Sequence, residues 1–406
     1  MSLRLDQIVL LLMFVPQVWG QELRSPRIDH LLATAAKNPR AVEEFWKEVQ
    51  RRGTPLIDAT VEEDDSVIVT FLWRGGAELR NVIVFASVLP ENDPTKQGLA
   101  HIPGTDIWYR SYRFPRDLSI LYELSPDGAG KLQRDPLNPR FLDGPMGGSI
   151  LVLPGVRNMQ WSDRRPTTQG TLETVPFQSR RLDNQRTLRV YLPAGFVRGQ
   201  GYDLLLMLDE DVYSGPVPLP NILDNLIASG RLRPTVAVLI GNADRQAELS
   251  CSSEFAEFLT QDLLPWIDGQ YQLQRKREHT TIAGSSLGGL AAAYVGWTQP
   301  ASFGNVIALS GSFRWRPALE AEPEWFTRQL TLNAAVPVRF YVGVGTHETG
   351  TPNEPGNLSL LTANRHLRDV LSAKGYDVKY QEFPGAHEPL SWRPAIADAL
   401  VAMQRE

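Results

Sequence analysis

The sequence has one cysteine, Cys251, in 406 residues. A single thiol cannot form an internal disulfide, so a hydrophobic core must hold the fold, and we interpret Cys251 as a buried, unreactive thiol. There is also no excess of positive charge, because 41 Lys and Arg residues stand against 46 Asp and Glu residues. This balance lacks the basic footprint of a nucleic-acid-binding protein, and we expect no nucleic-acid partner.

Cofactor and metal motifs are missing as well. We find no phosphate-binding Gly-rich loop, no dinucleotide fingerprint, no Cys-Xaa-Xaa-Cys pair and no His-Glu-Xaa-Xaa-His sequence. We therefore expect chemistry that needs neither a cofactor nor a metal ion. Hydrophobic residues make up 42% of the chain, enough for a sizeable core, and the length predicts about two domains.

The apolar stretch at the start of the chain is too short to span a bilayer, which takes about 20 residues. Arg4 precedes the apolar residues 8–15, and Val18-Trp19-Gly20 has the small-Xaa-small pattern of a cleavage site. This order is typical of a secretory signal peptide. We expect residues 1–20 to be a leader and the protein to be periplasmic or secreted, without stable membrane insertion. The alternative is a cytoplasmic protein with an apolar first helix.

The rest of the chain changes character near residue 154. Residues 26–153 begin with a helical pattern over 26–49 and continue as short strand-like runs, which predict a small β-sandwich, at 67–73, 81–86, 107–114 and 119–124. Residues 154–170 are polar and aperiodic, and are interpreted as a linker. In residues 171–406 strands and helices alternate, which predicts an α/β fold with a mostly parallel sheet and helices on both faces. A last helix is expected over 394–403.

A nucleophile elbow is predicted within the second part. The β-branched run 280–282 leads into Gly284-Ser285-Ser286-Leu287-Gly288, and the helix-forming residues 290–295 follow. A strand, a Gly-Xaa-Ser-Xaa-Gly turn and a helix are the order that places a serine hydroxyl clear of a sheet, and glycines let the neighbouring backbone pass closely. Ser286 is the predicted nucleophile.

A serine at neutral pH needs a base to take its proton. The sequence offers six histidines. Position along the chain leaves His347 and His387, and His387 follows a predicted strand at 378–383 and the turn 384–386. Catalytic groups in open α/β sheets collect beyond the carboxyl ends of strands, so His387 is the predicted base.

The acid that orients the base should lie between Ser286 and His387, in the chain order of α/β-hydrolases. Residues 336–345 read as a buried strand, and Glu348 follows its carboxyl end. Glu348 is the first candidate. Glu354 in the same loop is the alternative, and Asp369 is a weaker third candidate because it belongs to a predicted helix.

An oxyanion hole in this fold uses the backbone N–H after the nucleophile and a second N–H from a loop near the first strands. Leu287 supplies the first predicted donor. The apolar strand 202–209 ends in an acidic loop, where Glu210 or Asp211 would supply the second. Carboxylates there disfavour further negative charge unless a basic group offsets them, and Arg245, Arg314 and Arg316 are the candidates.

These motifs resemble the enterochelin (enterobactin) esterase family of α/β-hydrolases. The carboxyl-terminal likeness is carried by Gly-Ser-Ser-Leu-Gly-Gly at 284–289, Ser-Gly-Ser-Phe at 310–313, Gly-Thr-His-Glu at 345–348 and Gly-Ala-His at 385–387 with Trp392. The amino-terminal part is similar to the domain that precedes the hydrolase in longer members, through 53–57, 69–74 and the Asp-Pro-Leu-Asn-Pro sequence at 135–139. The likeness covers nearly everything after the leader.

The resemblance implies a serine esterase that opens the trilactone of an enterobactin-like catecholate siderophore and helps to release iron. It assigns attack to Ser286, proton transfer to His387 and orientation to Glu348. Arg245, Arg314 and Arg316 would then meet an anionic substrate, and Trp315 and Trp392 would stack on catechol rings. The alternative is an exported feruloyl or acetyl esterase of carbohydrate. The sequence leaves the oligomeric state open.

Overall fold

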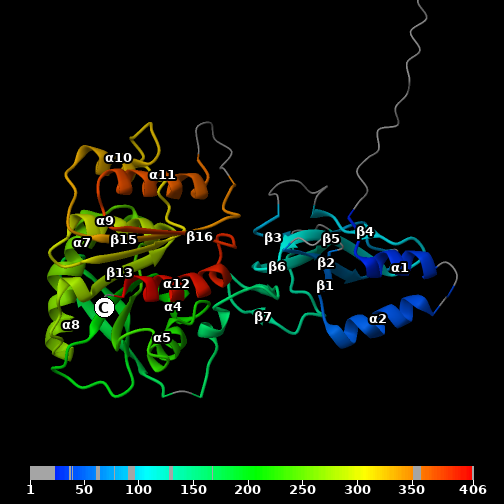
Figure 1. Cartoon of the computed structure of the whole chain (residues 1–406), viewed down its shortest axis with the longest axis horizontal. Helices are drawn as coiled ribbons and strands as arrows, with labels where there is room; N and C mark the ends of the chain where they lie inside the picture. Colours follow the sequence, from blue (N-terminus) through cyan, green and yellow to red (C-terminus); the bar gives the residue numbers. More distant parts are fainter. Residues whose placement is uncertain are drawn as a thin grey trace, which may run out of the picture.

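The computed structural model describes residues 23–35, 38, 40–60, 65–76, 78–89, 97–127, 131–166, 168–350 and 358–404. The amino-terminal strands lie at one end of the long axis of the molecule and a larger α/β part lies at the other (Figure 1). The predicted leader, residues 1–20, falls outside the described residues, as does Glu354.

Two helices open the described chain, α1 (Pro26–Ala35) and α2 (Ala41–Arg52). The prediction of one helical segment over 26–49 is therefore wrong. Pro39 disfavours helical backbone at the residue before it, which explains a break in this region. The second helix has acidic residues in its first turn and basic residues in its last, an order that the helix dipole favours.

Two antiparallel four-stranded sheets follow. The first has the order β1 (Leu56–Ala59), β2 (Ser66–Arg74), β5 (Ile107–Pro115) and β4 (Ala100–His101). The second has the order β3 (Val82–Ala86), β6 (Ser119–Pro126), β8 (Gly148–Val152) and β7 (Phe141–Leu142). All their pairings are antiparallel, as hairpin-rich sequences favour.

The two sheets pack face to face, and the helices cover the outer face of the first sheet. Strand β2 shows how: Val69 and Phe71 join the core between the sheets, whereas Leu72 packs with Ile28 and Trp46 of the helices. Alternation along a strand sends neighbouring side chains to opposite faces, so a strand covered on both sides is apolar throughout. The predicted β-sandwich is confirmed.

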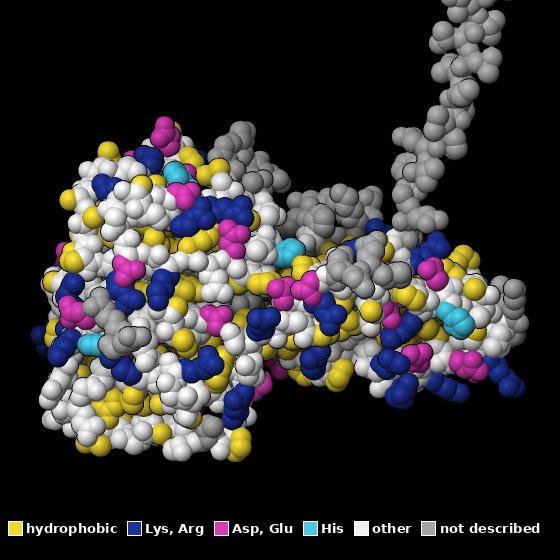
Figure 2. Space-filling model, viewed as in Figure 1, with side chains coloured by type: hydrophobic (Ala, Val, Ile, Leu, Met, Phe, Trp, Pro, Cys, Tyr) yellow, Lys and Arg dark blue, Asp and Glu magenta, His cyan; other side chains and the backbone are white. Residues whose placement is uncertain are grey.

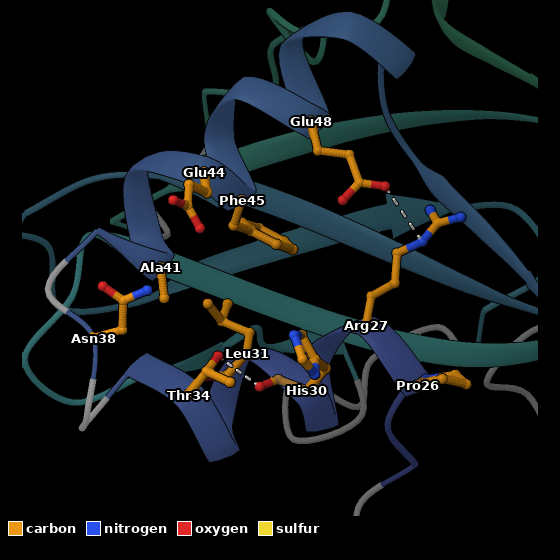
Figure 3. Close-up of a pocket in the computed structure, with 10 residues that line it drawn as sticks. All are labelled: Pro26, Arg27, His30, Leu31, Thr34, Asn38, Ala41, Glu44, Phe45 and Glu48. Carbon is orange, nitrogen blue, oxygen red and sulfur yellow. Dashed lines mark hydrogen bonds and ion pairs between the residues drawn. The ribbon is translucent and has the colours of Figure 1, made fainter.

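A hollow of about 410 Å³ lies between α1 and α2 (Figure 3). Arg27 and Glu48 face each other across it at 3.9 Å, and Leu31 and Phe45 form part of its floor. It lies at the end of the molecule opposite the predicted elbow (Figure 1). We therefore do not connect it with the chemistry of Ser286.

The segment that the sequence presents as a linker is packed against the α/β part. Residues 159–162 form a short 3₁₀ helix, η1 (Met159–Ser162), and Asn225 donates from Nδ2 to the carbonyls of Trp161 and Asp163, each at 2.8 Å. Asn158 donates to Asp398 at 2.6 Å. These bonds fix the path of the chain between the two parts.

The α/β part is built on one eight-stranded sheet with the order β16-β15-β14-β13-β11-β12-β10-β9. The six strands from β16 to β12 are parallel, and β10 and β9 form an antiparallel edge. Their bounds are β9 (Thr171–Ser179), β10 (Asn184–Leu192), β11 (Asp203–Leu208), β12 (Thr235–Ile240), β13 (Thr280–Ser285), β14 (Asn305–Leu309), β15 (Arg339–Gly345) and β16 (Val378–Phe383).

Helices cover both faces of this sheet, which confirms the predicted fold class. Side chains of α4 (Glu210–Ser214), α5 (Leu219–Ala228) and α12 (Pro389–Met403) form the core on one face. The other face carries α6 (Arg245–Leu249), α7 (Ser253–Glu257), η2 (Phe258–Leu263), α8 (Leu264–Tyr271), α9 (Leu287–Thr298), α10 (Trp325–Leu332) and α11 (Leu360–Ala373). A short turn of helix, η3 (Arg277–His279), precedes β13.

The last helix begins earlier than predicted. It starts at Pro389, where a proline is favourable because the first helical N–H has no partner in the helix, and it continues through Pro394. The expectation that it starts at residue 394 was wrong because a helix can tolerate one missing N–H when its face is buried. Ala395 and Ile396 show that burial.

Charged side chains of both signs are interspersed over the face drawn in Figure 2. Within the described residues, no helix combines the length and the apolar character that crossing a membrane requires. Because charges of both signs are interspersed, the surface in this view shows no broad patch of a single sign that would attract a polyanion.

Candidate active site

The predicted elbow forms as expected between β13 and α9. Ser286 has φ 57° and ψ −123°, a backbone conformation that residues other than glycine rarely adopt. The turn is held by backbone bonds from the N–H of Ser286 to Leu309 at 2.9 Å and from the N–H of Ser312 to Ser286 at 2.9 Å. The surrounding backbone thus stabilises a strained residue and leaves its side chain half-buried.

The two glycines of the motif pack against each other. A Cβ at Gly284 would lie 2.5 Å from the backbone of Gly288, and one at Gly288 would lie 2.9 Å from the Asp209 carboxylate. A side chain at either position would force its neighbours to shift. The spacing of the motif therefore follows from the close approach of the strand to the first turn of α9.

His387 lies within hydrogen-bond distance of Ser286, although 101 residues separate them along the chain. Its Nε2 is 2.9 Å from the Ser286 Oγ, and its side chain is 37% exposed. Its loop follows β16, and the Gly385 carbonyl accepts from the N–H of His347 at 3.0 Å. The backbone of the loop is therefore held in place, while the imidazole stays partly exposed to solvent.

Glu348 contacts the other nitrogen of the same ring. Its Oε2 lies 2.8 Å from the His387 Nδ1, and its side chain is only 1% exposed. Its Oε1 accepts from the Gly345 N–H at 2.8 Å and from the Ser310 hydroxyl at 2.5 Å. An ionised carboxylate can only accept, so we infer that Nδ1 carries a proton and that Nε2 is free to accept one from Ser286.

Ser310 and Trp392 complete this chain of hydrogen bonds, and the sequence did not assign either role. The Trp392 Nε1 donates to the Ser310 Oγ at 3.0 Å, and the indole meets the His387 ring edge-on with centroids 5.2 Å apart. Trp392 is 4% exposed. The prediction that it stacks on substrate is therefore wrong. Ser310 directly follows β14, and its place at a strand's carboxyl end was the available signal.

The predicted oxyanion donors begin two helices. Leu287 is the first residue of α9 and Glu210 is the first residue of α4, so neither N–H is used within its own helix. The side chain of Asp209, just before Glu210, approaches Gly288 in the first turn of α9. The starts of the two helices thus lie next to each other, and the role of the two N–H groups as oxyanion donors stays a prediction.

Two arginines pair with two of the three carboxylates at this point, Asp209 and Glu210. Asp209 is 1% exposed and accepts from Arg245 at 2.7 and 2.8 Å, and Asn242 donates to it at 2.8 Å. Hydrogen bonding to Asp209 raises the pKa of Arg245. Glu210 is paired with Arg189, which the sequence did not suggest. Arg245 was predicted to face substrate, and the structure shows it bound to Asp209.

The remaining predicted substrate contacts lie in the segment after β14. Arg314 donates to the Leu358 carbonyl at 3.4 Å, and the exposed Arg316 donates to the Ala321 carbonyl. Trp315 is half-buried and meets Trp325 edge-on with centroids 5.9 Å apart. Their part in substrate binding stays a prediction.

A hydroxyl beside the nucleophile was also missed. The Ser312 Oγ lies 3.5 Å from the Ser286 Oγ.

Among the described residues, no group of three or more His, Cys, Asp or Glu side chains has an arrangement that could hold a metal ion.

Comparison with known proteins shows the family to which the chain belongs. The family model described as "Putative esterase" matches residues 179–403, more than half of the chain. The chain belongs to this esterase family. A second model, "Enterochelin esterase, N-terminal", matches residues 68–162 of the esterase, and the resemblance read from the sequence is thereby confirmed. The protein is a carboxylic ester hydrolase.

Similar proteins align with the esterase over most of both chains. An iron(III) enterobactin esterase of Dickeya dadantii is 29% identical over 91% of this chain and 94% of its own. An iron(III) salmochelin esterase of Escherichia coli is 26% identical over 91% and 95%. The solved ferric enterobactin esterase of Salmonella typhimurium has 24% identity, a TM-score of 0.77 and coverage of 89% and 98%. This last likeness shows the shared fold.

Proposed function

We propose that Ser286, His387 and Glu348 are the catalytic triad of this esterase. The observation that carries the proposal is the unbroken series of contacts from the Ser286 Oγ to His387 and on to Glu348, at 2.9 and 2.8 Å. These distances lie within the reach that proton transfer from a serine to a base requires.

In the proposed reaction the Ser286 oxygen attacks the ester carbonyl while its proton passes to the His387 Nε2. The N–H groups of Leu287 and Glu210 hold the oxyanion of the tetrahedral intermediate. His387 then returns the proton to the departing alcohol, which leaves an acyl group on Ser286. Water attacks this acyl-enzyme with His387 again as base, and the products are the acid and free Ser286.

For the substrate we propose the trilactone of an enterobactin-like catecholate siderophore. Support comes from relatives named as enterobactin and salmochelin esterases that align over about nine-tenths of the chain, including the amino-terminal part. Such a substrate is anionic, and the exposed Arg316 and the half-buried Arg314 are the first positions to test for contact with it.

Turnover of ferric and iron-free enterobactin by the purified protein tests both proposals. Feruloylated oligosaccharide serves as the comparison substrate, and Ser286→Ala runs in parallel. We expect chromatography to show linear catechoyl-serine products with the wild type and none with the variant. If only the feruloyl ester is cleaved, the triad stands and the siderophore proposal fails. If Ser286→Ala retains activity, the nucleophile is misassigned.

We also propose that residues 1–20 direct export, so that the protein acts in the periplasm or outside the cell. The charge, apolar stretch and small-Xaa-small pattern of the leader support this. Expression in a Gram-negative host followed by amino-terminal sequencing of the periplasmic fraction is the test. A mature chain that begins at Gln21 is expected, whereas an intact leader in the cytoplasm would contradict export.

A further inference from the structure

The residue after His387 reaches into the amino-terminal sandwich. Glu388 is 7% exposed, and its Oε1 accepts from the N–H of Leu121 in β6 at 2.8 Å. Its Oε2 is hydrogen-bonded to the Ser87 hydroxyl, in the turn after β3. These partners precede Glu388 by 267 and 301 residues. A buried carboxylate that has both oxygens bonded to another part of the molecule is a fixed tether, because leaving such groups unpaired is costly.

The loop of the acid lies within electrostatic reach of the same part of the sandwich. His347 directly precedes Glu348, and burial lowers its pKa while the nearby Asp117 carboxylate opposes that change. Asp117 lies between β5 and β6, four residues before Leu121. The residue after the proposed base is thus hydrogen-bonded to β6, and the residue before the proposed acid lies near a charge of the β5–β6 turn.

The loop that carries His387 has one set of anchors on each side of the imidazole. On the amino side, the Gly385 carbonyl accepts from the N–H of His347 at 3.0 Å, and the N–H of Ala386 donates to the Ser391 Oγ at 3.1 Å. These bonds stay within the α/β part. On the carboxyl side, the Glu388 side chain is bonded to the sandwich. The position of His387 therefore depends on both parts of the chain.

We propose that Glu388 is a positioning residue through which the amino-terminal sandwich holds His387 in register with Ser286. This inference rests on the catalytic roles proposed above for these two residues. Glu388 is buried and faces away from solvent, so it acts through the loop and not on the substrate. The sandwich is then a structural part of the active site, and losing the tether lets the imidazole drift from the serine.

The test uses the full-length protein and a fluorophosphonate probe, which reports the reactivity of the serine without a natural substrate. Glu388→Ala is expected to slow labelling by about ten- to hundredfold, since a displacement of about 1 Å costs on that order. Glu388→Gln can still accept from Leu121 and donate to Ser87, and it should react within about threefold of the wild type because neutral hydrogen bonds retain most of the net stabilisation. Glu382→Gln, which breaks an exposed ion pair with Arg365, is the matched control and should leave the rate unchanged.

Steady-state kinetics with p-nitrophenyl butyrate separate positioning from binding. In Glu388→Ala we expect kcat to fall and KM to stay constant, because the carboxylate does not contact the ester. Labelling of Glu388→Ala at the wild-type rate would overturn the proposal, and so would equal losses in the Ala and Gln variants or a loss in the Glu382→Gln control.

If Glu388→Ala does not fold, Ser87→Ala decides. Removing one of the two bonds should slow labelling by about two- to fivefold, the equivalent of a weak net hydrogen bond, and an unchanged rate would refute the tether. A wild-type protein that the probe does not label would instead refute the proposed triad.

Discussion

Replacing Glu348 by glutamine tests the triad most sharply, because the neighbours of this side chain dictate how an amide would sit. The Gly345 N–H is a fixed donor 2.8 Å from Oε1. The Ser310 hydroxyl also donates to Oε1, at 2.5 Å. An amide in this place must therefore present its oxygen to Gly345 and Ser310. Its NH₂ group must then face His387.

That orientation of the amide favours the other tautomer of the His387 imidazole. An NH₂ group opposite Nδ1 requires Nδ1 to accept, so the proton moves to Nε2, which then points an N–H at the Ser286 Oγ. A ring in this tautomer cannot take the proton of the serine. By analogy with the loss from the wrong tautomer in serine proteases, we expect Glu348→Gln to lower kcat by about 10⁴-fold, or about 5.5 kcal/mol.

The assay measures the steady-state rate of p-nitrophenyl butyrate hydrolysis after any initial burst. Circular dichroism confirms that each variant is folded. Because glutamine fixes the wrong tautomer, it should give no more activity than Glu348→Ala. Glu354→Gln, the alternative acid from the sequence, should retain the wild-type rate. Activity of Glu348→Gln within tenfold of the wild type would refute the reasoning, and loss of activity in Glu354→Gln alone would move the acid to that residue.

Three further predictions concern stability. Burial raises the pKa of Glu388 to about 7 from 4.5, so its contribution to folding is complete below pH 4.5 and lost as pH rises through 7. In urea titrations the free energy of unfolding of the wild type should fall by about 3 kcal/mol relative to that of Glu388→Gln over this pH window. A difference between the two proteins that does not change with pH would contradict the raised pKa. Glu248→Ala leaves the buried Arg186 unpaired and should cost about 3–5 kcal/mol by thermal unfolding, with a loss under 1 kcal/mol contradicting a buried pair. Gly284→Ala places a Cβ 2.5 Å from Gly288 and should cost about 1–3 kcal/mol in chemical denaturation, whereas a neutral result would show that the elbow can relax.

Local pattern was enough for most of the elements. Residues 67–73, 107–114 and 378–383 were predicted as strands and lie in β2, β5 and β16. The errors fall where a local rule competes with burial. The proline at 394 suggested a helix start, but packing of α12 against the sheet keeps it helical on both sides of that residue. The short strands β4 and β7 have two residues each, too few to show a period.

The candidate site was predictable where chemistry requires a motif. Ser286 and His387 were chosen from the order of strand, turn and helix, and from position beyond a strand end. Ser310 and Trp392 were not, because their roles depend on contacts across 82 residues that no local pattern contains. The same holds for Arg189, which lies on β10 and pairs with Glu210 on α4.

By itself the sequence determined the fold class and the position of the elbow, because a strained turn between a strand and a helix demands glycines at fixed spacing. Only the tertiary structure decided which neighbours each of the other site side chains has. Trp392, which was predicted to stack on substrate, is buried against His387, and Arg245 forms an ion pair with Asp209. An aromatic ring or a guanidinium serves packing and binding equally well, and only its neighbours in space distinguish the two.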